Sequence, residues 1–204
     1  MKALRKIGIV GSGPMAIYLL KYLAASDEAL AISIFEASSC AGTGMPYDPS
    51  LNGDYMLCNA FSREIPAPVR PLVDWLKDRP KRELGEWELS AHDLTARAFY
   101  PRVLIGEYLH SQFEDLCENA RDAGHVINVL TECPVVDIEA ANGGKAKVQY
   151  QSGQSVKSLQ FDAVVIASGH SWPDVPHIDE ANLVSPWPYT NITELEQNDI
   201  GVLG

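Results

Sequence analysis

The chain has few basic residues and no long apolar run. Its 204 residues carry 27 Asp and Glu against 16 Lys and Arg, which gives a formal net charge of −11. This balance argues against nucleic acid or an anionic membrane as a partner, because both are negatively charged. No segment reaches the roughly 18 continuous apolar residues of a membrane-spanning helix. We therefore expect no nucleic-acid partner and no membrane partner.

Cysteine and histidine are also scarce, and neither is spaced as a set of metal ligands. The sequence holds 4 Cys and 5 His with no C-x-x-C pair, so we assign no metal. The basic N-terminus resembles an export signal, but residues 11–14 interrupt its apolar run. Free thiols without such a signal are typical of a reducing compartment, and we predict a cytoplasmic location. Cys40 and Cys58 lie in loops that we expect near a ligand.

The most informative segment begins as an apolar strand and continues through a glycine turn into a helix. Residues 6–16 read KIGIVGSGPMA, a G-x-G-x-x-A pattern. Gly11 permits the tight turn, Gly13 lets the backbone approach a pyrophosphate, and Ala16 packs the helix against its strand. Pro14 suits the first helical turn, where free N–H groups face the anion. The pattern predicts a dinucleotide phosphate site.

An acidic residue ends the second predicted strand. Glu36 lies 25 positions after Gly11, where a carboxylate can accept hydrogen bonds from both hydroxyls of an adenosine ribose. A 2′-phosphate would favour a basic side chain, and residues 37–40 offer none. The first site is therefore expected to hold FAD or NAD and to reject NADP.

The rest of the chain reads as α/β, with a central parallel sheet. Helices are predicted over residues 14–25, 71–78 and 102–123, and strands over residues 31–36, 126–130 and 161–167. Residues 81–83 read as a charged connection. A loop over residues 38–71 carries apolar and aromatic side chains, and we expect it to fold over a ligand. Short strands around an Asn-Gly-Gly turn predict a β-meander over residues 135–157.

Together these features resemble the two-dinucleotide-binding flavoproteins, which include glutathione reductase and the flavin-containing monooxygenases. In that group the late strand ends in an Ala-Thr-Gly motif beside the FAD pyrophosphate, and residues 167–169 read Ala-Ser-Gly here. A closer resemblance, over residues 6 to about 204, is to the FAD-NAD(P)-binding family. It rests on G-x-G-M-P-Y (42–47), M-L-x-N (56–59), E-I-P (64–66), F-Y-P-R (99–102), G-E-Y-L (106–109) and G-H-x-W-P (169–173).

The resemblance implies a Rossmann-like FAD-binding domain, with FAD as cofactor and NAD(P)H as co-substrate of the full-length protein. Arg102 begins a predicted helix and could direct its guanidinium at a phosphate or a substrate carboxylate. The expected cofactor-binding residues are Gly11, Ser12, Gly13, Pro14, Met15, Glu36, Ala37, Gly44, Met45, Arg102, Val135, Ala167, Ser168 and Gly169.

Two residues are candidates for the chemistry beside the flavin. Asn59 lies in a segment similar to one of the flavin monooxygenases, where an asparagine sits near the flavin. Its alternative role is to satisfy backbone groups of the loop. His170 follows the late strand and could lie near the flavin edge, with an exposed or backbone-bonded histidine as the alternative.

Domain organisation follows from the end of the sequence. Residues 200–204, Ile-Gly-Val-Leu-Gly, repeat the pattern of residues 7–11. We expect an FAD-binding domain over residues 1–170, a linker over 171–198, and the first strand of a truncated NAD(P)-binding domain over 199–204.

The leading functional hypothesis is an FAD-binding domain of an NAD(P)H-dependent, monooxygenase-like oxidoreductase. A disulfide reductase is disfavoured, because it needs a redox cysteine pair and Cys40 and Cys58 are 18 positions apart. Two alternatives stay open. One is a regulatory module that binds FAD or NAD without turnover, and the other is a single-site NAD-dependent dehydrogenase.

Overall fold

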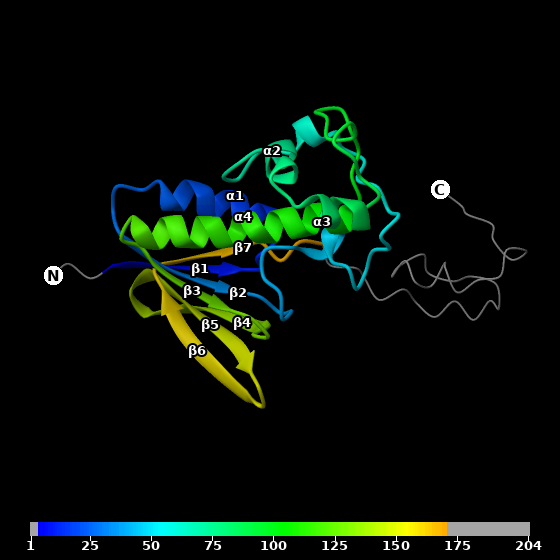
Figure 1. The fold of residues 1–204 in the computed structure, drawn as a ribbon. Coiled ribbons are helices and arrows are strands. Elements are labelled where there is room, and N and C mark those ends of the chain that lie inside the picture. The colour runs from blue at the N-terminus through cyan, green and yellow to red at the C-terminus, as the bar shows by residue number, and fades with distance from the viewer. Residues whose placement is uncertain (1–3, 171–204) are drawn as a thin grey trace, which may run out of the picture.

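A four-stranded parallel sheet forms the centre of the computed structural model, which describes residues 4–170 (Figure 1). Its strands stand in the order β3-β2-β1-β7 and pair in parallel throughout. Their bounds are Arg5–Val10 for β1, Leu30–Phe35 for β2, Val126–Leu130 for β3 and Ala163–Ile166 for β7. The predicted α/β class and central parallel sheet are confirmed.

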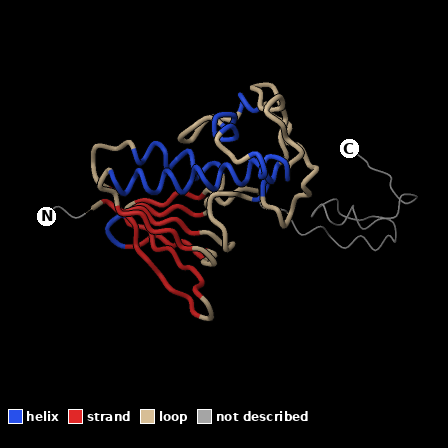
Figure 2. Tube along the Cα trace, in the orientation of Figure 1, coloured by secondary structure: helices blue, strands red, loops and turns tan. Residues whose placement is uncertain are grey.

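Two helices cover one face of this sheet. Helix α1 (Pro14–Ala24) and helix α4 (Arg102–Asp122) pack against each other, and Figure 2 shows both on the same side of the strands. Apolar side chains fill the space between the helices and the sheet: Ile9, Ile17, Leu20, Ile32, Ile34 and Ile105 are all fully buried. Burial of such side chains is the main favourable term in folding.

The predicted β-meander is confirmed as a three-stranded antiparallel sheet, which lies on the other side of the parallel sheet from α1 and α4 (Figure 1). It consists of β4 (Val135–Ala141), β5 (Lys145–Ser152) and β6 (Ser155–Phe161). The meander extends further than the predicted limit of residue 157. Phe161 ends β6 instead of beginning the late strand, because its ring packs edge-on against Phe35, with centroids 5.9 Å apart.

The segment between β2 and α4 contains only short helices. Two 3-10 turns (Met45–Tyr47 and Ser62–Glu64) precede α2 (Leu72–Lys77) and α3 (Lys81–Glu86). The prediction of a charged connection at residues 81–83 was wrong, because these residues begin α3. Leu84 anchors that helix in the core with 7% exposure. An ion pair between Arg79 and Glu83 supports its first turn.

Two sequence predictions fall on residues beyond this part of the chain: the linker over 171–198 and the strand over 199–204 lie outside the described residues. Within residues 4–170, no helix is long and apolar enough to cross a membrane. In the same residues no group of three or more His, Cys, Asp or Glu side chains could hold a metal ion.

Candidate functional site

A cavity of about 970 Å³ opens at the carboxyl ends of the parallel strands. This is where the sheet reverses its strand order between β1 and β7, and open α/β sheets bind ligands at such a reversal. The predicted site residues that line it are Gly11, Ser12, Gly13, Pro14, Met15, Glu36, Ala37, Gly44, Met45, Val135, Ala167, Ser168, Gly169 and His170. Segments separated by more than 150 residues in sequence therefore meet at one cavity.

The two glycines of the turn have different structural roles. Gly11 has a φ of +92°, and a Cβ added there would lie 2.4 Å from the carbonyl oxygen of Ala167. Its N–H donates to the carbonyl of Phe35 at 2.8 Å. A Cβ on Gly13 would meet only the Cα of Gly44, at 3.3 Å. Gly11 is thus required by packing between strand ends, whereas Gly13 lines the cavity and packs closely against the Gly44 backbone.

The N-terminus of α1 points free donors at this cavity. Gly13 is the N-cap residue, Pro14 occupies the first turn, and no side chain caps the helix. The first turn also contains no acidic residue. The uncapped N–H groups and the helix dipole therefore remain available to an anion such as a pyrophosphate.

The Glu36 carboxylate accepts four hydrogen bonds from the protein. Oε2 accepts from the N–H and Oγ of Ser12, and Oε1 accepts from the N–H (2.9 Å) and Oγ (3.0 Å) of Ser38. A carboxylate offers about four acceptor positions. Ribose hydroxyls would therefore have to share or replace some of these donors, and those of exposed Ser38 are the more accessible.

Ser12 connects three segments at the base of the cavity. Its side chain is fully buried, and its Oγ both donates to Glu36 and accepts from the N–H of Gly42 at 2.9 Å. The loop closes tightly above it, since a Cβ on Gly44 would lie 2.8 Å from Cδ of Pro14. The sequence identified Ser12 as a cofactor contact but gave no sign of this bridging role.

Two predicted site residues, Arg102 and Asn59, do not line the cavity. The Arg102 Nε donates to the carbonyl of Leu57 at 3.4 Å, and its backbone N–H donates to Met56 at 2.8 Å. Arg102 therefore holds the loop at residues 56–57 rather than reaching the phosphate cradle. Asn59 is exposed. A contact of Arg102 with a phosphate or substrate carboxylate, and a role of Asn59 beside the flavin, stay predictions.

Side chains of α4 and the preceding loop complete the cavity wall, and the sequence did not single them out. Tyr47, Glu107 and His110 all line it. Burial raises the pKa of Tyr47, the Cys58 thiol beside it adds to the increase, and Arg102 opposes it. Burial likewise raises the pKa of Glu107. The sequence features that could have pointed to Tyr47 and Glu107 are the G-x-G-M-P-Y and G-E-Y-L segments, which contain them.

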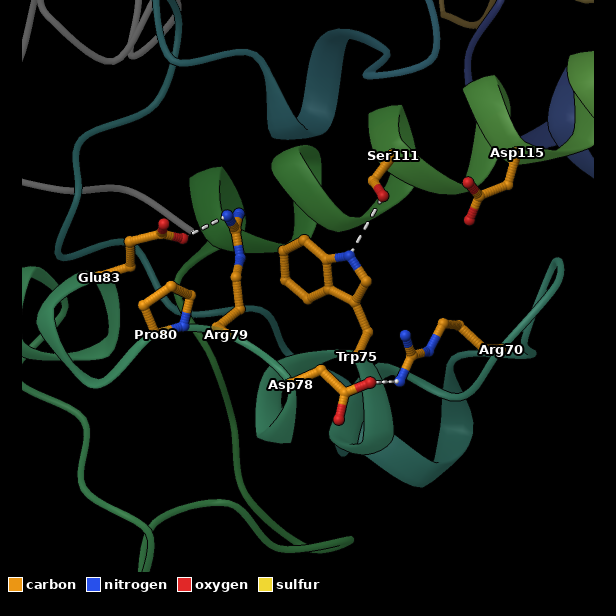
Figure 3. A pocket seen from close by; sticks show the side chains of 8 residues that line it. All are labelled: Arg70, Trp75, Asp78, Arg79, Pro80, Glu83, Ser111 and Asp115. Carbon is orange, nitrogen blue, oxygen red and sulfur yellow. Dashed lines mark hydrogen bonds and ion pairs between the residues drawn. The ribbon is translucent and has the colours of Figure 1, made fainter.

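A smaller hollow of about 350 Å³ is lined by residues that include Trp75, Arg79 and Glu83 (Figure 3). Arg79 stacks over the Trp75 ring, 4.2 Å from its centroid, and pairs with both Glu83 and Glu107 at 2.6 Å. The pKa of Glu107 is still raised, because the effect of burial exceeds the opposing effect of Arg79. Arg70 pairs with Asp78 at 2.6 Å. Both arginines of the hollow are thus neutralised within the protein.

Comparisons with known proteins agree with this geometry. The family described as FAD-NAD(P)-binding matches residues 8–171. The uncharacterized protein YdhS of Escherichia coli K12 is 36% identical over 201 residues, which cover 98% of this chain and 37% of that protein. This chain thus spans little more than a third of the length of that relative.

Solved structures with the same fold are more distant in sequence. S-allyl-L-cysteine S-oxygenase from Allium sativum superposes with a TM-score of 0.57 at 20% identity, over 87% of this chain and 40% of the enzyme. Ornithine N-hydroxylase from Kutzneria sp. 744, in complex with reduced FAD, NADP+ and L-ornithine, gives 0.53 at 18% identity, over 80% of this chain and 37% of the enzyme.

Proposed function

Because this chain belongs to the FAD-NAD(P)-binding family, we propose that it is the FAD-binding domain of an NAD(P)H-dependent, monooxygenase-like flavin oxidoreductase. FAD and NAD(P)H are the cofactors of the family. The reaction and the residues that contact the flavin are part of this proposal. The cytoplasmic location also remains a prediction from the sequence.

The observation that carries the proposal is the set of segments that surround one cavity: the glycine turn, the uncapped start of α1 and the end of β7. Gly13 lines this cavity without a side chain, so its backbone can approach a pyrophosphate there. The residues present therefore fit a pyrophosphate. Glu36 and Val135 line the same cavity and would receive the adenosine half of the dinucleotide.

The protein residues bind and orient rather than react. The N–H groups of α1 would hold the pyrophosphate, and Glu36 would hold the ribose. Residues of the loop over 38–51 line one side of the cavity. The bound flavin would itself supply hydride acceptance from NAD(P)H and electron transfer to oxygen.

The fold of the two solved oxygenases supports the monooxygenase class over a disulfide reductase. Within residues 4–170, Cys58 is buried and Cys40 is exposed, and neither forms a disulfide. A dithiol–disulfide cycle beside the flavin would require two cysteines within bonding distance.

A visible spectrum tests the proposal directly. The purified chain is mixed with FAD, freed of excess cofactor by gel filtration, and scanned for the blue absorbance of flavin. We expect retained FAD that ADP displaces and NADP displaces poorly. Gly13→Val is the matched variant, and it should retain little FAD. A wild-type chain that elutes without flavin, or that binds NAD in preference to FAD, would refute the proposal.

For the full-length protein, we expect NAD(P)H oxidation that depends on added FAD and consumes oxygen. An oxygen electrode and the loss of near-ultraviolet NAD(P)H absorbance measure both. FAD retention without any NAD(P)H oxidation would instead favour the regulatory-module alternative.

A further inference from the structure

One cysteine of the described residues differs from the others in its surroundings. Cys58, Cys117 and Cys133 are buried, whereas Cys40 is exposed. Burial raises the pKa of the Cys117 thiol to about 11, which keeps it in the unreactive thiol form, because the thiolate is the nucleophile. Cys40 is the exposed thiol, which a reagent in solution can reach.

Cys40 is accompanied by a histidine and a carboxylate. Its Sγ lies 3.7 Å from Nδ1 of His110 on α4, although the two residues are 70 positions apart. The carbonyl of Ala41 lies 2.6 Å from the same Nδ1, which fixes that nitrogen as a donor. The other ring nitrogen, Nε2, faces Oε1 of Glu114 at 3.7 Å.

An imidazolium at His110 would place its positive charge beside the sulfur, with Nδ1 3.7 Å from Sγ. Such a ring would donate from Nδ1 to Ala41 and form an ion pair with Glu114, whose Oε1 lies 3.7 Å from Nε2. A thiolate is stabilised by an adjacent imidazolium. Because Nδ1 donates to Ala41, His110 would act on Cys40 through its charge and not as the base that accepts the thiol proton.

The cluster also lies on the wall of the dinucleotide cavity. Cys40, Thr43 and His110 all line it. The Cys40 carbonyl accepts a hydrogen bond from Oγ of Ser38 at 2.8 Å, and the same Oγ contacts Glu36. A group attached to the Cys40 sulfur would therefore occupy space beside the expected adenosine site.

We propose that Cys40 is a redox-modifiable thiol that forms a mixed disulfide with low-molecular-weight disulfides of the glutathione type, in competition with dinucleotide binding. The reactivity of Cys40 stands on the cluster alone, whereas the competition rests on the proposed FAD site.

The step balances as a thiol–disulfide exchange. The Cys40 thiolate attacks one sulfur of the small disulfide, a new S–S bond forms, and the original S–S bond breaks. The second sulfur leaves as a thiolate and takes up the proton that Cys40 lost. Cys40 is oxidised, the leaving sulfur is reduced, and the small disulfide is the only oxidant required.

In the experiment, the 204-residue chain without FAD is mixed with dipyridyl disulfide. The thione that is released when a thiol of the protein reacts is measured over time. We expect one fast equivalent in the wild-type protein, its loss in Cys40→Ser, and its retention in the matched control Cys117→Ala. His110→Gln keeps a donor for Ala41 but cannot carry a charge, and it should slow the fast phase about tenfold. A fast phase that survives in Cys40→Ser, or that is unchanged in His110→Gln, overturns the proposal.

A second measurement tests the competition. Saturating FAD should slow the fast phase at least about tenfold, because it would occupy space beside Cys40. The protein carrying a glutathione mixed disulfide should bind FAD at least about tenfold more weakly. FAD should oppose formation of the mixed disulfide at equilibrium by the same factor as this loss of affinity, because the coupling of the two equilibria is reciprocal. Intact mass confirms the modification. An FAD-loaded protein that reacts as fast as the free protein overturns the competition. Absence of FAD binding in every form would refute the proposed function, while the Cys40 and His110 variants still decide the reactivity.

Discussion

Ser12 and Glu36 are joined by two hydrogen bonds, in which the N–H and the Oγ of Ser12 both donate to Oε2 of Glu36. Ser12 follows the first glycine of the turn, and Glu36 follows directly after β2. The bonds therefore tie the ends of two neighbouring strands together at the floor of the cavity. A carboxylate expected to serve the ribose alone also holds the phosphate turn in place.

Ser12→Ala should weaken both stability and FAD binding. The substitution removes one donor to Glu36 and leaves the buried N–H of Gly42 without its acceptor. An unsatisfied buried group costs about 1–3 kcal/mol. Urea unfolding measures the loss of stability, and calorimetry measures FAD affinity. Ser39→Ala, at a neighbouring exposed residue of the same cavity, is the control and should leave stability unchanged. Equal stability of Ser12→Ala and wild type would show that the bridge contributes nothing.

Glu36→Ala should lose about 1.5–3 kcal/mol of FAD affinity, the scale of a hydrogen bond to a charged group. The structure adds that stability should fall as well, because Ser12 and Ser38 lose their shared acceptor. Glu36→Gln retains an oxygen acceptor and should be less affected in both measurements. Calorimetric titration measures the FAD affinity of each variant. If Glu36→Ala binds FAD with wild-type affinity, Glu36 does not bind the ribose.

Gly11 and Gly13 should respond differently to substitution. Gly11→Ala places a Cβ 2.4 Å from the Ala167 carbonyl oxygen at a φ of +92°, so we expect a less stable fold. Gly13→Val should keep the fold and weaken FAD binding by several kcal/mol, because the side chain fills space that the pyrophosphate needs. Denaturant melts and FAD titrations on both variants make the comparison. A Gly13→Val protein that is folded and binds FAD normally would contradict the phosphate-site interpretation.

Asp162 forms a contact between β1 and the end of the meander, and we expect this contact to be sensitive to acid. Its Oδ2 accepts from the Lys6 N–H at 2.7 Å, and Lys145 lies 3.4 Å from Oδ1. The Lys6 hydrogen bond, and to a smaller extent Lys145, lower the pKa of Asp162 below its ordinary value of 3.8. A lowered folded pKa means that the stabilisation is present above 3.8 and is lost as the pH falls through the folded value.

Asp162→Asn should therefore be less stable than wild type at neutral pH, and the difference should shrink as the solution is acidified below pH 3.8. Urea unfolding across this range measures it. Asp54→Asn, at an exposed loop residue, controls for the general effect of removing a carboxylate. A difference that is constant with pH would exclude the ionised Asp162 contact.

The regular elements were predictable because their causes are local. The apolar runs of β1 and β2 and the glycine turn are read from neighbouring residues, and their bounds agree with the structure to within one or two positions. Helix α3 was missed because its surface is mostly charged and its single anchor, Leu84, gives no periodic signal.

The side-chain contacts of the cavity were not predictable in the same way. The approach of Cys40 to His110 depends on how the loop after β2 lies against α4, and nothing near either residue in sequence encodes it. The same holds for Ser12 and Gly42, whose contact arises only when the turn and the loop fold against each other.

The last prediction compares two glycines in helices. A Cβ on Gly106 of α4 would lie 2.5 Å from the carbonyl oxygen of Tyr47 and 3.0 Å from Cγ2 of Thr43, whereas a Cβ on Gly85 of α3 would meet nothing within 4 Å. Alanine is the better helix former by about 0.5–1 kcal/mol. Gly85→Ala should therefore stabilise the protein, and Gly106→Ala should destabilise it by about 1–3 kcal/mol through overpacking.

Gly106→Ala should also weaken FAD binding, because the clash displaces the loop that carries Thr43 and Tyr47 along the cavity wall. Urea unfolding and FAD titration on both variants separate the two effects. Gly85→Ala lies away from the cavity lining and should bind FAD as the wild type does. If Gly106→Ala gained stability as Gly85→Ala does and kept its FAD affinity, close contact between α4 and this loop would not be what shapes the cavity.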